Sequence, residues 1–399
     1  MLLGLLARVL APGGWSPWET AILLAYAGTI PWSAISSGNA LVGLALRLWR
    51  PAPPRSAGTG QARTALALCI RNEDMAEVLA PLPALLDGLE AAGQGPRFVL
   101  WFLSDTRDSV RAAREEAAIA GFAAQRSGRP IAVRYRRRVL NTGFKAGNVM
   151  EFMDSHAAGL DLMLSLDADS AMTAAAVLRL VAEMEADPRL AILQQLIAGR
   201  PAEAAFPRLF QFGMRAGMRC WTTGQDWWQG DEGPYWGHNA ILRIAPFRAH
   251  ARLKDLPGGD TLLSHDQVEA ARLHAAGWKV RCLADDAGSL EASPPAMPEF
   301  LVRDRRWGAG NMQYLRLLGQ PWLRPMGRWQ LAQAILLFVT APLWLVLLAA
   351  GVLNAATGGA AATPPGALAL LLGATWLTYY APKLAGYLEA FLRAPLAAR

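Results

Sequence analysis

Short apolar runs in the first half of the chain end abruptly in polar residues, and this pattern limits the fold more than any other feature. The runs are Thr64–Ile70, Arg97–Leu103, Ile131–Tyr135 and a run from Leu162 that ends at Asp167. Helical stretches separate them, as in repeated β-α units. Further strands are predicted near Leu190 and Trp278. The sequence therefore predicts an α/β fold with a doubly wound, mostly parallel sheet.

Acidic residues follow three of these strands. Glu73 comes just after the first strand, Asp105 follows the second, and Asp167 and Asp169 close the fourth. In doubly wound sheets, ligands bind beyond the carboxyl ends of the strands. Two carboxylates one residue apart can hold a hard divalent cation and leave its outward positions for phosphate oxygens. Asp-x-Asp alone also occurs in solvated loops, but three acidic strand ends at one edge favour a diphosphate-metal site.

Two stretches in the middle of the chain suit ligand binding. In Thr142–Asn148 the glycines let the backbone approach a ligand and Lys145 supplies a cation, although a plain helix entry with a surface lysine would look similar. The stretch Gln225–Asn239 mixes rings, amides and acids, a composition suited to sugar. An aromatic belt at a bilayer surface is the alternative for this stretch.

Two further motifs lie downstream. Asp266, in Ser-His-Asp, opens a predicted helix over 267–276, where its carboxylate can cap the helix, act as a base, or do both. The cluster Arg303–Trp307 offers guanidinium groups and a stacking indole, and it is equally typical of a basic segment next to a membrane.

A membrane is indicated by composition, since 53% of the 399 residues are hydrophobic and only 18% are charged. The stretch 329–382 holds no charged residue, and 354–366 divides it into two segments near the length that crosses a bilayer. A third uncharged run covers 20–46. We therefore expect about three transmembrane helices. The apolar but short Met1–Leu10 segment is predicted to be an interfacial helix rather than a signal peptide.

Arginines flank these runs on one side, and the positive-inside rule then places the large middle region in the cytoplasm. The predicted organisation is an interfacial segment (1–18), a transmembrane helix (19–48), a cytoplasmic α/β domain (49–300), a juxtamembrane Arg/Trp segment (301–328), a transmembrane helix (329–353), an external loop (354–366), a transmembrane helix (367–382) and a cytoplasmic tail (383–399).

The net charge of +7 does not favour nucleic acid as a partner. The basic residues concentrate near the predicted membrane ends and in Arg134–Arg138, a distribution that favours lipid headgroups or a phosphorylated substrate. Cys69, Cys220 and Cys282 lack CxxC spacing, so neither a disulfide framework nor a zinc site is predicted.

Taken together, these motifs resemble the membrane-bound family 2 glycosyltransferases, which include cellulose, chitin and hyaluronan synthases. The sequences of these motifs are closer to one branch, the glucan biosynthesis glucosyltransferase H family, which elongates osmoregulated periplasmic glucans. The similar stretches are Thr142–Asn148, Tyr235–Ala240, Leu263–Asp266 and Arg303–Trp307. The chain departs from the wider family at Arg303, where that family has Gln, and at His265, where it has Glu. It is also short for the family, whose members generally carry longer termini and more spans.

The resemblance implies a GT-A type fold and an inverting transfer of glucose from UDP-glucose to a growing β-glucan in the bacterial inner membrane. It implies a catalytic base at Asp266, Mg²⁺ or Mn²⁺ on Asp167 and Asp169, and a periplasmic glucan-processing partner. The implied nucleotide-binding residues are Glu73, Asp105, Lys145 and Asp167, and those near the acceptor and diphosphate are Trp236, Gly237, His238, Asn239, Arg303, Arg306 and Trp307.

Three other interpretations remain open on the sequence. One is a family 2 transferase that makes another polysaccharide or a glycolipid from a different nucleotide sugar. The second is a catalytically silent glycan-binding scaffold, which the complete acidic set argues against. The third is a transporter, for which three helices are few.

Overall fold

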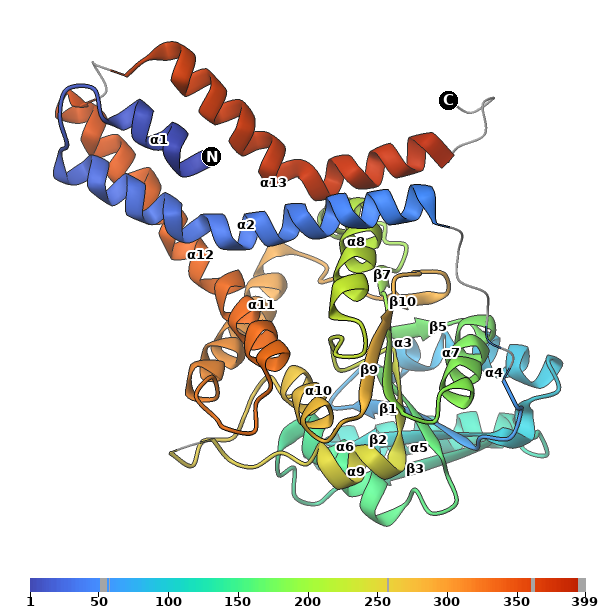
Figure 1. Cartoon of the computed structure of the whole chain (residues 1–399). Helices are drawn as coiled ribbons and strands as arrows, with labels where there is room; N and C mark the ends of the chain where they lie inside the picture. The colour runs from blue at the N-terminus through green and yellow to red at the C-terminus, as the bar shows by residue number, and fades with distance from the viewer. Residues whose placement is uncertain (51–55, 57, 257, 360–362, 394–399) are drawn as a thin grey trace. The chain divides into compact units, whose positions relative to one another are not determined.

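The computed structural model describes residues 1–50, 56, 58–256, 258–359 and 363–393, which form two compact units (Figure 1). The helical unit contains 1–50, 216–225 and the chain from 332 onward, and the sheet unit contains the rest. Two parts of the predicted organisation lie outside the described residues. They are residues 360–362 of the predicted external loop and residues 394–399 of the predicted tail.

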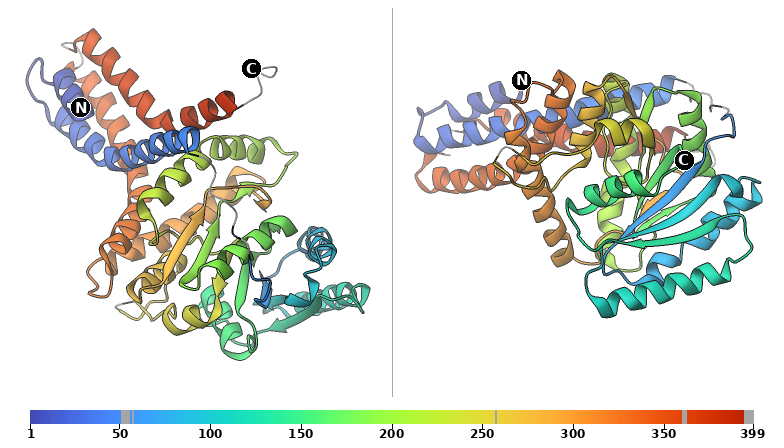
Figure 2. Two further views of the ribbon diagram at one scale, coloured as in Figure 1. Left: turned by 45° about the vertical axis from the view of Figure 1, so that its right-hand side comes forward. Right: turned by 90° about the horizontal axis from the view of Figure 1, so that it is seen from below.

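A seven-stranded sheet forms the centre of the sheet unit, in the order β3-β2-β1-β4-β8-β6-β9. Its strands are β1 Thr64–Ile70, β2 Phe98–Ser104, β3 Ala132–Arg137, β4 Leu162–Asp167, β6 Leu190–Gln195, β8 Ala240–Arg243 and β9 Lys279–Leu283. All neighbours are parallel except β8, which runs antiparallel to β4 and β6. Strands β1 to β3 lie side by side in the right-hand view of Figure 2. The prediction of a mostly parallel α/β sheet is confirmed.

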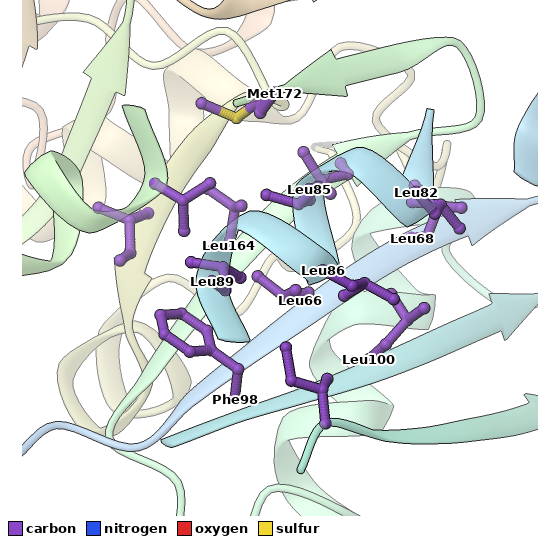
Figure 3. Close-up of a cluster of buried hydrophobic side chains, with 14 of the residues drawn as sticks. Leu66, Leu68, Leu82, Leu85, Leu86, Leu89, Phe98, Leu100, Leu164 and Met172 are labelled. Carbon is purple, nitrogen blue, oxygen red and sulfur yellow. The ribbon is translucent and has the colours of Figure 1, made fainter. Parts of the chain in front are cut away.

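Helices cover both faces of this sheet, as the doubly wound arrangement requires. Alternate strand residues point to opposite faces. Leu66 and Leu68 of β1 face α3 Met75–Leu79, α4 Leu82–Ala91, α5 Ser109–Gln125 and α7 Ala174–Ala186. Figure 3 shows the α4 leucines lying over β1 and β2. Ala65 and Ala67 face α6 Phe144–Ser155, α9 Ile244–His250 and α10 Asp266–Ala275.

A second sheet consists of three short strands, of which β5 follows β4 in the chain and β7 follows β6. It has the order β5-β10-β7, with β5 Ser170–Met172, β7 Ala198–Gly199 and β10 Ser289–Glu291. Strand β5 starts directly after Asp169, and Ser170 pairs with Glu291. The sequence signalled none of these strands because each is only two or three residues long. The sheet unit is completed by η1 Gly95–Arg97, α11 Met297–Met312 and η2 Gln313–Arg316.

The helical unit contains α1 Leu2–Leu10 and α2 Pro17–Trp49, together with most of α12 Pro325–Ala356 and α13 Pro365–Arg393. Ser16 and Glu19 form a capping box at the start of α2, in which the Glu19 N–H donates to Ser16 Oγ at 3.1 Å. The predicted interfacial segment forms α1, and its Leu6, Val9 and Leu10 pack among the other helices. Helix α13 continues past Pro382 into the predicted tail.

Part of α8 Ala205–Gln229 also belongs to the helical unit, namely Ala216–Gln225. Glycines bring the backbones here into close contact. A Cβ on Gly43 would lie 1.7 Å from the Cys220 carbonyl oxygen, and one on Gly386 would lie 1.3 Å from that of Ala216. These contacts allow only glycine at both positions.

Among the helices that the structure describes, α12 alone combines the length and the apolar composition needed to cross a membrane. Helices α2 and α13 are 33 and 29 residues long, but α2 carries buried Thr29, Ser33 and Asn39, and α13 ends in a charged stretch. The expected total of three transmembrane helices is therefore not confirmed.

Candidate active site

The carboxyl edge of the main sheet brings the predicted acidic strand ends together. Register pairs Cys69 of β1 with Asp167 of β4, and Ile70 of β1 with Ser104 of β2, so that Asp105 follows at the same edge. Strand β8 runs in the opposite direction and therefore starts at this edge, where Ala240 pairs with Ser165. The segment Trp236–Asn239, which precedes β8, lies beside Asp167 for this reason.

The Asp167–Asp169 loop is held from both sides. The N–H of Asp167 donates to Ser170 Oγ at 3.0 Å, and the N–H of Ala292 donates to the Asp169 carbonyl at 3.3 Å. Because Ala292 directly follows β10, and β10 pairs with β5, the second sheet fixes the path of this loop.

Lys145 lies against Asp167. Its Nζ donates to Asp167 Oδ1 and, at 2.9 Å, to the Gly237 carbonyl. Burial opposes the charge of both partners, yet the pair raises the pKa of Lys145 and lowers that of Asp167. Helix α6 begins at Phe144, one residue before Lys145. Its N-cap residue is Gly143, which has a left-handed φ of 71°. The predicted glycine-rich loop thus positions a cation beside a predicted metal ligand.

Negative charge accumulates around this loop. Burial first, and then the Asp167 charge, raise the pKa of Asp169. Burial and the neighbouring Asp169 likewise raise the pKa of Glu73 and of Glu291. Four oxygen-bearing acids that repel one another suit a hard divalent cation. Nowhere in the described chain do three His, Cys, Asp or Glu side chains form a metal site by themselves. A cation on Asp167 and Asp169 would therefore take further ligands from water or phosphate.

The Gly237 carbonyl links Lys145, the partner of Asp167, to the segment before β8. It accepts hydrogen bonds from Lys145 Nζ, from Ser165 Oγ at 3.0 Å and from Tyr235 Oη at 3.2 Å. A Cβ on Gly237, whose φ is +88°, would lie 3.6 Å from Asp266 Cβ and 3.7 Å from Asp266 Oδ2. The predicted base and the predicted metal ligands thus meet around one glycine.

Buried amides shape the rest of the segment before β8. Gln194 Oε1 accepts from the Trp236 N–H at 2.8 Å, and Gln194 Nε2 donates to the His238 carbonyl at 3.0 Å. Asn239, with φ of 48°, donates to Ser289 Oγ at 3.1 Å. His238 Nε2 lies 3.4 Å from Glu291 Oε2. Asn239 is therefore buried support, whereas the Trp236 and His238 side chains are partly exposed at the edge.

Asp105 is almost fully buried and is bound by Arg138. Arg138 Nε and Nη2 donate to the two Asp105 carboxylate oxygens, at 2.7 Å each. The same guanidinium donates to the Thr142 carbonyl at 2.9 Å and to that of Phe144 at 2.8 Å. Asp105 therefore also supports the loop that carries Lys145.

The loop before Asp266 is fixed by the segment that contains the Arg/Trp cluster. Tyr314 Oη donates to the Ser264 carbonyl at 3.1 Å, and the Leu263 N–H donates to Gln313 Oε1 at 2.9 Å. A Cβ on Gly310 would lie 2.3 Å from Ser264 Oγ, so α11 packs closely on this loop. The predicted helix is present as α10, which begins at Asp266, one residue before the predicted range. His265 and not Asp266 holds its N-cap position, so the predicted capping role of Asp266 is wrong.

Arg303, Arg306 and Trp307 lie on α11. The Arg303 guanidinium lies over the Trp307 ring at 4.5 Å, and its charge opposes the rise that burial causes in the pKa of Asp169. Trp307 is 43% exposed and Arg306 is also exposed. Arg303 thus joins the acidic cluster electrostatically, whereas Arg306 lies at the exposed surface of α11.

Three supporting residues were not among the predicted site residues. Arg138 directly follows β3 within a basic run, so its place at the sheet edge could have been recognised. Gln194 lies near the end of β6 and had the same signal. Glu291 belongs to a three-residue strand that no sequence pattern marks.

Comparison with known proteins gives consistent results. Residues 162–382 match the model of the glycosyl transferase family group 2. The chain is 37% identical over 361 residues to glucans biosynthesis glucosyltransferase H of Rhodopseudomonas palustris, covering 87% of this chain and 49% of that protein. It is 35% identical over 357 residues to the protein of that name from Caulobacter vibrioides, covering 87% and 53%. The chain spans about half the length of these curated relatives.

Among solved structures, the chain is similar to a mannosyltransferase from Pyrobaculum calidifontis in complex with GDP-Man and Mn²⁺. The TM-score is 0.53 at 16% identity, and the match covers 98% of both chains. At this identity the likeness supports the GT-A type fold alone.

Proposed function

The chain belongs to the glycosyl transferase family group 2 and is a glycosyltransferase, and from this premise we propose that it transfers glucose from UDP-glucose to a growing β-glucan with inversion. The motif resemblance to the glucosyltransferase H branch agrees with identities of 35–37% to proteins of that name. The glucose donor, the glucan acceptor and the stereochemistry are part of this proposal.

One observation carries the proposal, namely that Asp266 and Lys145 meet at Gly237. The carbonyl of Gly237 accepts from Lys145, which also binds Asp167, and the backbone of Gly237 packs against the Asp266 side chain. A base beside a cation and a pair of metal-binding acids is the arrangement that glycosyl transfer from a nucleotide diphosphate requires.

In the proposed reaction, Asp266 accepts the proton of an acceptor hydroxyl as that oxygen attacks the anomeric carbon of the donor. The bond from this carbon to the diphosphate oxygen breaks, and UDP leaves with the electron pair. Lys145 stabilises the leaving diphosphate. Mg²⁺ or Mn²⁺, held by Asp167 and Asp169, would supply further positive charge to the leaving group. The hard oxygen donors and the excess negative charge of the loop support this assignment.

The remaining residues are assigned by position. Glu73 and Asp105 are assigned to the nucleotide, with Asp105 acting while bound to Arg138. Trp236, Gly237 and His238 are assigned to the acceptor side, and Asn239 supports them through its bonds to β10. Arg303, Arg306 and Trp307, on the helix that packs against the Asp266 loop, are assigned to the diphosphate and acceptor.

We assign the protein to the bacterial inner membrane as a multi-pass protein with its sheet unit in the cytoplasm. The apolar helix α12 and the arginines beside the uncharged runs support this placement. A periplasmic glucan-processing protein is the expected partner for a glucan product, and the lipid bilayer is the expected surroundings of the helical unit.

Product analysis tests the proposal. Purified protein in detergent or liposomes receives radiolabelled UDP-glucose, UDP-galactose, UDP-N-acetylglucosamine or GDP-mannose with Mg²⁺ or Mn²⁺. The proposal expects a β-glucan from UDP-glucose only, with metal required. A polymer or glycolipid from another donor would identify a different transferase. Absence of metal-dependent nucleotide release from every donor would instead indicate a silent scaffold.

A further inference from the structure

The residue before the predicted base forms a pair that the reaction described above does not use. His265 Nδ1 lies 2.9 Å from Glu269 Oε2, one helical turn further along α10. The Glu269 side chain is 2% exposed and that of His265 is 15% exposed. A buried carboxylate thus holds the histidine ring in a fixed orientation at the start of this helix.

The surroundings of the pair favour a charged imidazole. Burial lowers the pKa of His265, but the Glu269 charge and hydrogen bond and the Asp266 charge outweigh it, so that the pKa lies above its usual value. Lys145, from α6, opposes this effect. Burial, together with the Glu269 and Asp266 charges, raises the pKa of two buried phenols, Tyr235 and Tyr314, which therefore stay neutral.

The His265 charge also acts on Asp167, one of the two carboxylates proposed to hold the metal. Burial alone would raise the pKa of Asp167, and the positive charges of Lys145, His238 and His265 together lower it. The contacts agree with this, because His265 directly precedes Asp266, whose side chain lies beside Gly237, and the Gly237 carbonyl accepts from the same Lys145 that binds Asp167.

We propose that the His265 imidazolium, held by Glu269, is a further binding residue for the donor diphosphate and adds one positive charge to that of Lys145. This inference rests on the proposed nucleotide-sugar transfer. A structural role alone, as the residue that caps α10, would not depend on charge.

Nucleotide binding tests this proposal in the full-length protein. The Kd values of UDP and GDP are measured by calorimetry with Mg²⁺ between pH 6 and 9, for wild type and variants. The diphosphate affinity of the wild type falls about tenfold as the pH rises through the pKa of His265, the size expected for one partly screened charge. His265→Gln binds weakly at every pH and lacks this step. His265→Arg keeps tight binding to high pH.

Glu269→Gln tests the pair without removing the ring. Loss of the carboxylate lowers the pKa of His265, so the step in affinity moves to lower pH. His250→Gln, an exposed histidine at the end of α9, serves as the matched control and behaves as wild type. Thermal melting of each variant establishes that it is folded.

The outcomes separate the two proposals. Binding of GDP but not UDP to the wild type would overturn the UDP-glucose assignment, while the His265 inference would still be tested with GDP. Wild-type affinity in folded His265→Gln across the whole pH range would overturn the His265 inference and leave the proposed function intact. Binding of neither nucleotide would count against both.

Discussion

Arg138 and Asp105 form a buried, bidentate ion pair with both hydrogen bonds at 2.7 Å. The side chains are 2% and 9% exposed, respectively. Because the same guanidinium also binds two carbonyls of the loop before Lys145, the pair joins the end of β2 to the start of α6. One arginine therefore positions both Asp105, which is proposed to bind the nucleotide, and Lys145, which is proposed to bind the diphosphate.

Arg138→Gln should destabilise the sheet unit. Removing one partner of a buried ion pair leaves an uncompensated charge and costs about 3 to 5 kcal/mol. We expect a clear fall in the denaturation midpoint of the purified protein, followed by fluorescence. Arg137→Gln, at the exposed neighbouring position, should change the free energy of unfolding by less than about 1 kcal/mol. Equal midpoints for the two variants would show that the buried pair does not stabilise this edge.

Asp266→Asn should abolish transfer without loss of donor binding. A general base contributes roughly 10² to 10⁴ in rate, and an amide cannot accept the acceptor proton. We expect kcat to fall by at least about a hundredfold, while the Kd of UDP stays close to that of the wild type. Asp260→Asn, which removes an exposed partner of Arg316, is the matched control. Near-normal turnover by folded Asp266→Asn would assign the base elsewhere.

Asp169→Asn should weaken the response to divalent cations. Loss of one of two carboxylate ligands raises the Mn²⁺ concentration needed for half-maximal activity, by about tenfold or more. Titration of activity with Mn²⁺ after treatment with EDTA measures this change. Asp154→Asn, at an exposed ion pair with Arg252, should leave the titration unaltered. Unchanged metal dependence in Asp169→Asn would exclude this carboxylate as a ligand.

Acid should destabilise the sheet unit through His274. Burial, assisted by the Arg324 charge, lowers the pKa of this histidine to about 4 from a usual value of 6.5. The unfolded chain therefore binds a proton that the folded chain excludes. Stability is fully present above pH 6.5 and falls by about 3 kcal/mol as the pH drops to 4.

His274→Leu should remove this pH-dependent loss, because the side chain no longer binds a proton. Denaturation midpoints measured between pH 7.5 and 4.5 test the difference, with His250→Gln as the exposed control. A parallel decline of wild type and His274→Leu would assign the acid sensitivity to other groups.

The ends of the strands could be predicted because each buried apolar run is followed directly by polar residues, so that the change in sequence marks the end of the strand. β1, β2 and β4 match the predicted runs within one residue, and the acids that follow them gather at one edge. The direction of β8 could not be predicted, since a strand of four residues carries no signal of orientation. Its reversal explains why Trp236–Asn239 lies at the same edge without following a strand end.

The roles of individual side chains were harder to infer than their positions. The sequence predicted that Asp105 binds the nucleotide, and it did not reveal that Arg138 binds both carboxylate oxygens. Asn239 appeared as an acceptor residue, but it is fully buried and bonded to β10. In both cases the partner comes from a distant part of the chain, so local pattern contains no information about it.

The division of α8 affects how this protein can be shortened. Ala216–Gln225 pack with α2 and α13, and both ends of the same helix belong to the sheet unit. Truncation of both termini would therefore strip the cover from Gly217, Cys220 and Gly224 in the middle of the remaining chain. A shortened protein for crystallisation would need new polar residues along these ten positions.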